Sequence, residues 1–172
     1  NIEAEDADTA VFYSISNCQA GLAGISFGNS LIKQVVSDLS RELPNLKTFV
    51  TLSPIPSLNR WLVETGTDTA SHAQDQQRQI AAHYLLNAKR ADGTPYDPVA
   101  RFHLGNGALV HEVHADADLS DNGLAQSGGA MVNYLYDLPL ISQNHERFAS
   151  AQVVVASPEV TALSAAAEQK DT

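Results

Sequence analysis

The fold is decided by the stretch Phe49-Val50-Thr51-Leu52-Ser53-Pro54-Ile55-Pro56, in which a β-type run leads into a Ser and two prolines. Proline lacks the backbone N–H that a sheet ladder needs, so the strand should end where Pro54 and Pro56 restrain the chain. The Ser53 hydroxyl would then be held rigidly at the carboxyl end of a strand. In open α/β sheets, ligands bind at that end of the strands.

Toward the amino end, residues 10–16 are another β-type run, and the glycine-rich segment 19–28 opens onto a helix that begins near Asn29. Apolar residues at three- and four-residue steps predict this helix, and Pro44 should end it. The apolar positions are Leu31, Ile32, Val35, Val36, Leu39 and Leu43. Two parallel strands joined by a helix need a right-handed crossover, so residues 16–28 and 52–57 should share one edge of the sheet.

The glycine-rich segment 19–28 has two interpretations that the residues leave open. Glycines allow backbone N–H groups to approach a ligand closely, and the amino end of a helix adds partial positive charge, which suits a pyrophosphate. A tight turn between strand and helix needs the same glycines. The spacing matches neither the dinucleotide fingerprint nor the P-loop, because no Gly-Lys-Ser/Thr follows.

The carboxyl half continues with alternating elements. Helices are predicted at residues 58–63, 76–87 and 158–168, with inward positions Ile80, Tyr84, Leu85, Val160, Leu163 and Ala167. Residues 98–113 are expected to hold two short extended pieces around Gly105-Asn106-Gly107, and residues 116–129 a loop rich in Asp and Gly. With no repeat and no internal boundary, this order favours a single α/β unit.

Two histidine-bearing segments could carry chemistry. His103 is expected in an extended piece, on the opposite face from Phe102 and Leu104, where it could exchange protons near neutral pH or simply form a structural hydrogen bond. The segment 111–118 holds two His and several carboxylates, but on a strand His111 and His114 would point to opposite faces. The acidic spacing also misses a calcium loop, so we expect a solvated loop and no metal site there.

Size and charge narrow the function classes. The chain has 172 residues, 44% of them apolar, which is enough for one domain with a real core. A net charge of -10 argues against a nucleic-acid or anionic-membrane partner but not against a small anionic ligand. One cysteine, Cys18, and no apolar run of ~18 residues or signal peptide favour a cytoplasmic protein. A first residue other than Met indicates a processed or truncated piece.

Taken together, residues 11–36, 48–62, 97–108 and 115–137 resemble the catalytic region of the malonyl-CoA decarboxylase family. The stretches that carry the resemblance are Phe12-Tyr13-Ser14-Ile15-Ser16, residues 19–28, Leu31-Ile32-Lys33-Gln34-Val35-Val36, residues 52–56, residues 97–108 and Met131-Val132-Asn133-Tyr134. Each motif alone is weak, but four separated motifs in the family's order make the match specific.

The resemblance implies an α/β (α+β) fold of the acetyltransferase (GNAT) superfamily, with a mixed central sheet flanked by helices. Residues 1–172 would be the C-terminal part of the catalytic domain, and the N-terminal helical domain would be absent from this chain. The earlier half of the sheet would come from a companion chain or be lost by proteolysis. We therefore expect exposed apolar edges in the isolated chain.

The implied reaction converts malonyl-CoA to acetyl-CoA and carbon dioxide, with no cofactor because the CoA thioester is itself the substrate. The resemblance implies that Ser53 and His103 are the catalytic pair. The implied CoA-binding loop is Ala23, Gly24, Ile25, Ser26, Phe27, Gly28 and Asn29. Either Ser53 holds the malonyl carboxylate while His103 protonates the carbanion, or Ser53 acts as a proton acceptor. Lys33, Arg60 and Arg101 are candidates for the CoA phosphates, and we expect a homo-oligomer.

Three other functions remain possible from the residues. A CoA-dependent acetyltransferase would use the same loop but would leave the Ser53–His103 pair without a role. A non-catalytic acyl-CoA-binding module would bind the ligand and release no product. A Ser–His hydrolase would need a small-residue elbow that exposes the nucleophile, and Ser53 lacks one.

Overall fold

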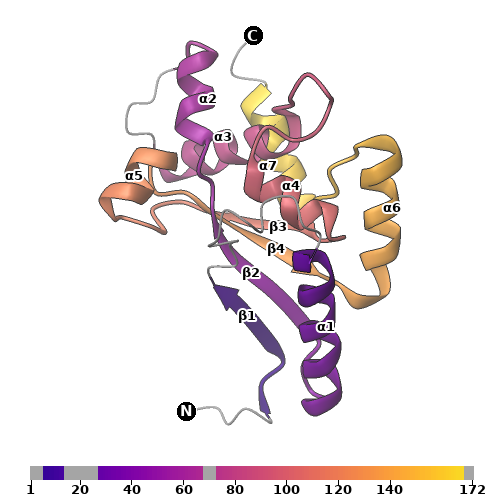
Figure 1. Cartoon of the computed structure of the whole chain (residues 1–172). Helices are drawn as coiled ribbons and strands as arrows, with labels where there is room; N and C mark the ends of the chain where they lie inside the picture. Colours follow the sequence, from indigo (N-terminus) through magenta and orange to yellow (C-terminus); the bar gives the residue numbers. More distant parts are fainter. Residues whose placement is uncertain (1–5, 14–26, 68–72, 169–172) are drawn as a thin grey trace.

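The computed structural model describes residues 6–13, 27–67 and 73–168, with side chains from Ile32 onward in the second range. In these ranges four strands form one mixed sheet in the order β1-β2-β4-β3 (Figure 1). β1 (Thr9–Tyr13) and β2 (Thr48–Pro54) are parallel, whereas β4 (Met131–Tyr136) runs antiparallel to both β2 and β3 (Leu109–His114). The predicted mixed sheet is confirmed.

Helix α1 (Phe27–Glu42) connects β1 to β2, so the predicted crossover between parallel strands is confirmed. The helix ends two residues before Pro44, as the missing N–H of proline requires. Ile32 and Val36 are buried in the core, and Leu39 and Leu43 are partly buried against it. Val35 is exposed, so it does not belong to the inward face that the spacing predicted.

Alternation along the two central strands sends one set of side chains into the core. Thr51 and Ser53 of β2 point to the same face as Tyr134 and Tyr136 of β4, because residues two apart share a face. Thr51 pairs across the ladder with Tyr134. All four side chains are buried. Hydroxyl groups and aromatic rings therefore lie together on one face of the sheet.

Three helices match their predictions. They are α2 (Leu58–Glu64), α3 (Gln74–Asn87) and α7 (Pro158–Glu168). α3 and α7 pack against each other, and both contact β3. The predicted inward residues Tyr84, Leu85 and Val160 are buried, and Ile80 and Leu163 are partly buried at the edge of the core. No helix in the described ranges is long and apolar enough to cross a bilayer.

The prediction of an extended piece before Gly105 is wrong, because helix α4 spans Pro98–Gly105. The Asp97 side chain accepts hydrogen bonds from the backbone N–H groups of Val99 and Ala100, and Pro98 stands at the first helical position. This is a strong start signal for a helix. His103 therefore lies on a helix, and the predicted strand on which it would face away from Phe102 and Leu104 does not exist.

The expected loop 116–129 also contains a short helix, α5 (Asp121–Ser127). The Ser120 hydroxyl accepts a hydrogen bond from Gly123 N, and Gly128 closes the helix in the left-handed conformation with φ of 65°. After β4, a 3-10 turn at Leu138–Leu140 leads into α6 (Ile141–Ala151), which packs against α4. Within the expected loop, Ser120 and Gly128 thus cap the two ends of a helix.

Candidate active site

The Ser53 hydroxyl and the His103 imidazole meet although 50 positions separate them in the chain. Ser53 Oγ lies 3.4 Å from His103 Nε2. β2 supplies Ser53 from the position directly before its last residue, Pro54, and α4 supplies His103 from its final turn. Ser53 is 5% exposed and His103 is 0% exposed. The structure therefore brings the two predicted residues into one buried pair.

Strand β4 encloses the other side of the His103 ring. His103 Nδ1 lies 2.7 Å from Tyr136 Oη, and the imidazole ring stacks on the Tyr134 ring with a centroid separation of 4.5 Å. Burial lowers the pKa of His103 to about 3. Burial also raises the pKa of both tyrosines. All three rings are therefore uncharged at neutral pH.

Thr51 extends this chain of polar groups beyond Ser53. Its Oγ1 lies 2.9 Å from Ser53 Oγ, since the two residues stand two apart on the same face of β2. The backbone N–H of Tyr134 also donates to Thr51 Oγ1, at 3.4 Å. The polar chain thus runs from Thr51 through Ser53 and His103 to Tyr136.

Buried donors decide which way these hydrogen bonds point. Among the described residues, the Tyr136 hydroxyl has no possible acceptor other than His103 Nδ1, and the Thr51 hydroxyl has none other than Ser53 Oγ. Leaving either donor unpaired in the core would cost about 1–3 kcal/mol. We therefore assign the proton of His103 to Nε2, which donates to Ser53 Oγ. The Ser53 O–H is then free to point out of the cluster.

Asp97 holds the amino end of the helix that carries His103. It is 1% exposed, and its carboxylate accepts hydrogen bonds from Val99 N and Ala100 N, each at 2.9 Å, and from Tyr84 Oη at 3.2 Å. Burial raises the pKa of Asp97, while the hydrogen bonds from Ala100, Tyr84 and Val99 act in the opposite direction. Asp97 thus links α3 to the start of α4, the helix that carries His103.

Thr51, Tyr136 and Asp97 had no individual role in the sequence interpretation. The signal for Asp97 is the Asp-Pro pair at the start of a helical apolar pattern. The signal for Thr51 is its place two residues before Ser53 on the same strand. Tyr136 carries no comparable signal, because its contact with His103 depends on how α4 sits over β4.

The expected CoA-binding loop falls mostly outside the described ranges. Residues 23–26 lie outside them, and Phe27, Gly28 and Asn29 form the first turn of α1. The helix starts two residues earlier than the spacing predicted. Lys33, the candidate cation on that helix, is half-buried. CoA binding by this loop stays a prediction.

The other two candidate cations have partners within the chain. Arg101 donates to the carbonyl oxygens of Pro95 and Tyr96 at 2.8 and 2.9 Å, so it closes the turn before α4. Arg60 donates to Tyr96 Oη at 3.1 Å and forms an ion pair with Glu64 at 3.8 Å. Of the two, Arg60 is the more exposed, and it remains the better placed for an anion in solution.

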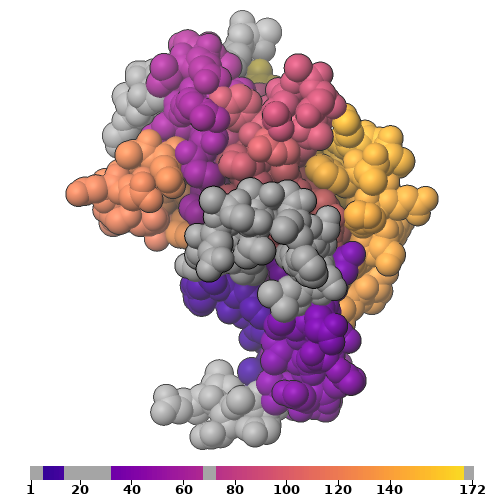
Figure 2. Space-filling model, viewed as in Figure 1, coloured from indigo at the N-terminus to yellow at the C-terminus, as the bar shows by residue number. Residues whose placement is uncertain are grey.

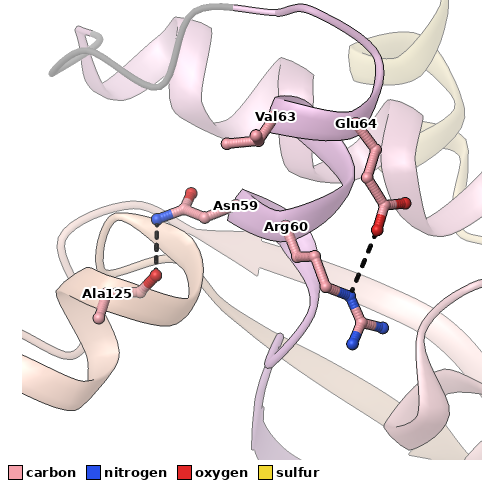
Figure 3. Close-up of a pocket in the computed structure, with 5 residues that line it drawn as sticks. All are labelled: Asn59, Arg60, Val63, Glu64 and Ala125. Atoms are coloured by element: carbon pink, nitrogen blue, oxygen red, sulfur yellow. Dashed lines mark hydrogen bonds and ion pairs between the residues drawn. The ribbon is translucent and has the colours of Figure 1, made fainter.

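A shallow hollow between α2 and α5 lies apart from the buried pair. The space-filling view shows α5 projecting from the body beside α2 (Figure 2). The hollow is lined by Asn59, Arg60, Val63, Glu64 and Ala125 (Figure 3). Asn59 Nδ2 bridges the two helices by donating to the carbonyl oxygens of Leu124 and Ala125. Neither Ser53 nor His103 lines this hollow, so it is a separate surface feature.

The histidines of β3 have a different environment. The ladder between β3 and β4 shifts register between Val110 and Glu112, and His114 Nε2 contacts Asn133 Oδ1. In the described part of the chain, no three His, Cys, Asp or Glu side chains gather as a metal site would require. The side chain of His114 is therefore engaged with an amide.

Three comparisons with known proteins all match malonyl-CoA decarboxylases. A model described as the malonyl-CoA decarboxylase C-terminal domain matches residues 1–78 and 64–172. The mitochondrial malonyl-CoA decarboxylase of Anser anser anser is 32% identical over 208 residues, which cover 93% of this chain and 41% of that protein. The crystal structure of malonyl-CoA decarboxylase from Rhodopseudomonas palustris is 46% identical, with a TM-score of 0.85 over 94% of this chain and 43% of that one.

A more distant structure supports the fold. The loading GNATL domain of CurA from Lyngbya majuscula has a TM-score of 0.52 and 14% identity, over 81% of this chain and 58% of that one. This likeness shows the predicted GNAT-like fold. The chain spans less than half the length of the malonyl-CoA decarboxylases that it matches. Because the family model matches along the whole chain, the chain belongs to the malonyl-CoA decarboxylase C-terminal domain family.

Proposed function

We propose that the complete protein containing this chain converts malonyl-CoA to acetyl-CoA and carbon dioxide, with Ser53 and His103 as the reacting groups. The observation that carries the proposal is the buried 3.4 Å contact between Ser53 Oγ and His103 Nε2 in a chain of this family. Residues 1–172 would be the C-terminal part of the catalytic domain. The remainder of the enzyme would complete the site for the acyl-CoA.

The reaction breaks the bond between the α-carbon and the carboxylate of the malonyl group. The electron pair of that bond moves onto the thioester as an enolate, and carbon dioxide leaves. The rate depends on hydrogen-bond donors aimed at the developing charge and on a fixed orientation of the carboxylate. One proton must then reach the α-carbon to give acetyl-CoA.

The proton passes to the substrate through Ser53. His103 is fully buried whereas Ser53 retains a small exposed surface, so a bound substrate meets the serine first. The Ser53 O–H protonates the α-carbon, and the Nε2–H of His103 passes to the serine oxygen. At the same time the Tyr136 O–H gives its proton to His103 Nδ1, so the imidazole stays neutral and the negative charge ends on the Tyr136 oxygen. A proton from water restores the Tyr136 hydroxyl once product leaves. The lowered pKa of His103 supports this order, because the resting imidazole is neutral and its Nδ1 can accept that proton.

CoA binding is proposed for the loop Ala23–Asn29. Phe27, Gly28 and Asn29 form the amino end of α1, a 16-residue helix. Free backbone N–H groups at such an end, together with the helix dipole, favour the negative charge of a pyrophosphate. The acyl-CoA itself is the substrate, and the proposed chemistry uses the side chains Ser53 and His103.

The decisive experiment incubates the complete protein with malonyl-CoA and measures acetyl-CoA and carbon dioxide together. Equal amounts of both products are expected. Free CoA without acetyl-CoA would identify a hydrolase, and binding without any product would identify an acyl-CoA-binding module. Acetyl transfer to an added amine in place of decarboxylation would identify an acetyltransferase. Each of these three outcomes contradicts the proposal.

A variant of Ser53 connects the activity to the site. Ser53→Ala should lower kcat by about 10²–10⁴-fold, the range of general acid–base catalysis. The matched control is Ser150→Ala, since the exposed Ser150 hydroxyl only donates to the carbonyl oxygen of Glu146 on its own helix. Full activity of Ser53→Ala would remove Ser53 from the reaction.

A further inference from the structure

We propose that Asp97 is a positioning residue that sets the separation of Ser53 and His103, a role that rests on the proposed function. Its carboxylate is buried between α3 and the start of α4. Its hydrogen-bond partners do not include the reacting pair. It instead holds the start of the helix that carries His103 and, through Tyr84, contacts the helix that follows Ser53.

One arm of this arrangement leads from Asp97 to His103. The carboxylate Oδ1 accepts from Val99 N and Ala100 N at 2.9 Å each, so it is fixed to the first turn of α4. Six residues of helix, about 9 Å at the usual rise, then separate Asp97 from His103. A hydrogen-bonded helix of this length is stiff. The imidazole must therefore follow any movement of the capped end.

The other arm leads from Asp97 to Ser53. Tyr84 donates to the same carboxylate at 3.2 Å, and its ring contacts Trp61 of α2, the helix that follows β2, with 5.4 Å between ring centroids. Between Ser53 and Ser57 stand Pro54 and Pro56, whose rings restrain the backbone. This connection is also stiff. The carboxylate thus joins two rigid arms, one ending at each member of the pair.

The pair is sensitive to how these arms are held. A separation of 3.4 Å lies beyond the usual range for an O–H or N–H donor to these atoms. A shift of about 0.5 Å in the wrong direction would abolish the hydrogen bond, and active sites tolerate little more than that. Tyr84 donates to the second carboxylate oxygen at 3.2 Å and anchors the junction to α3.

The test is Asp97→Asn in the complete protein. The Asn side chain keeps an oxygen for the N–H groups of Val99 and Ala100, so α4 stays capped. Its NH2 group replaces the second oxygen and removes the acceptor of the Tyr84 hydroxyl. We expect kcat to fall about tenfold or more while KM changes less than about twofold. The imidazole ¹⁵N resonances of His103 should also shift.

The matched control is Ser120→Ala, which removes the corresponding cap of α5, where Ser120 Oγ accepts from Gly123 N. It should lower the unfolding temperature and leave kcat and the His103 resonances unchanged. Asp97 would be only a helix cap if folded Asp97→Asn kept wild-type kcat and wild-type His103 resonances. That result overturns the proposal.

Two further measurements keep the outcome of this test unambiguous. If Asp97→Asn does not fold, Tyr84→Phe removes a single hydrogen bond from the carboxylate, and wild-type His103 resonances and kcat in that variant overturn the proposal. If the wild-type protein does not decarboxylate malonyl-CoA, the proposed function fails, but the His103 resonances of both variants still test the positioning role. Failure of one proposal is thus distinguishable from failure of the other.

Discussion

Two histidines contact opposite faces of strand β4. His103 approaches from α4 and is 0% exposed. His114 lies on β3, and its side chain is 33% exposed. It contacts Asn133, whose Nδ2 donates to the carbonyl oxygen of Thr51 at 2.8 Å. Each histidine is thus connected to β2, within a few residues of Ser53.

The difference lies in the partners. The two nitrogens of His103 face hydroxyl groups, which both donate and accept hydrogen bonds and can pass a proton along. His114 Nε2 faces the amide oxygen of Asn133, which only accepts, and His114 Nδ1 lies 3.9 Å from the Glu112 carboxylate on its own strand. In the proposed reaction, the hydroxyl neighbours and the burial of His103 fit it to pass a proton, whereas His114 joins β3 to β4 through Asn133.

The largest expected effect separates the two histidines directly. His103→Asn should lower kcat for malonyl-CoA decarboxylation by about 10²–10⁴-fold, because it removes the group that refills the Ser53 proton. His114→Asn should change kcat by no more than about twofold, as expected for a substitution outside the reacting groups. Steady-state kinetics on both purified variants, with acyl-CoA affinity measured in parallel, tests this difference in kcat. Comparable losses of kcat in both variants would contradict a special role for His103.

At acid pH the free energy of unfolding should fall, because the buried His103 resists protonation. The folded-state pKa of about 3 lies below the ordinary value of 6.5, so protons bind the unfolded chain more readily. The stability from this group is complete above pH 6.5 and is lost as pH falls toward 3. The slope is at most about 1.4 kcal/mol per pH unit.

Chemical denaturation at several pH values measures this slope. Between pH 6.5 and 4.5 the free energy of unfolding should fall more steeply for the wild type than for His103→Gln, in which nothing titrates at that position. Tyr134 and Tyr136 do not interfere, because burial raises the pKa of both phenols. Parallel slopes would mean that His103 is better hydrated than its burial indicates.

Features that depend on residues close together in the sequence were easier to predict than contacts between distant segments. The helix at 158–168 was predicted to the residue, because its spacing and its leading proline are local signals. α4 was predicted as extended, because residues 98–113 were interpreted from the Gly105-Asn106-Gly107 turn alone and the Asp97 cap was overlooked. Both signals are local, and the cap was the stronger.

The site shows the limit more clearly. Ser53 and His103 were identified by resemblance to a family, since neither residue stands out by itself. Thr51 and Tyr136 were missed because their roles depend on the strand register, in which Thr51 lies opposite Tyr134, and on the packing of α4 over β4. Register between distant segments is set by the whole sheet and leaves no mark in a short stretch of sequence.

Tyr136 should have a moderate effect. Tyr136→Phe removes the hydroxyl that donates to His103 Nδ1 and leaves a buried acceptor unpaired, at a cost of about 1–3 kcal/mol. Freed from this partner, the imidazole can also move its proton to Nδ1, which interrupts donation to Ser53. We expect kcat to fall about tenfold with KM little changed. The ¹⁵N resonances of His103 report the tautomer, and an unchanged Nε2–H form would refute this role.

Tyr134 should have the smallest effect, and it tests the same idea from the opposite side. Its ring stacks on His103, but its hydroxyl is buried without a hydrogen-bond partner among the described residues. Tyr134→Phe keeps the stacking and removes an unpaired polar atom, so the free energy of unfolding should stay level or rise by about 1 kcal/mol. Activity should remain within about twofold of the wild type, since no proton passes through this hydroxyl. A loss of kcat as large as that of Tyr136→Phe would show that the Tyr134 hydroxyl has a hydrogen-bond partner in the working enzyme. The two tyrosines would then no longer differ as a hydrogen-bonded and an unpaired hydroxyl.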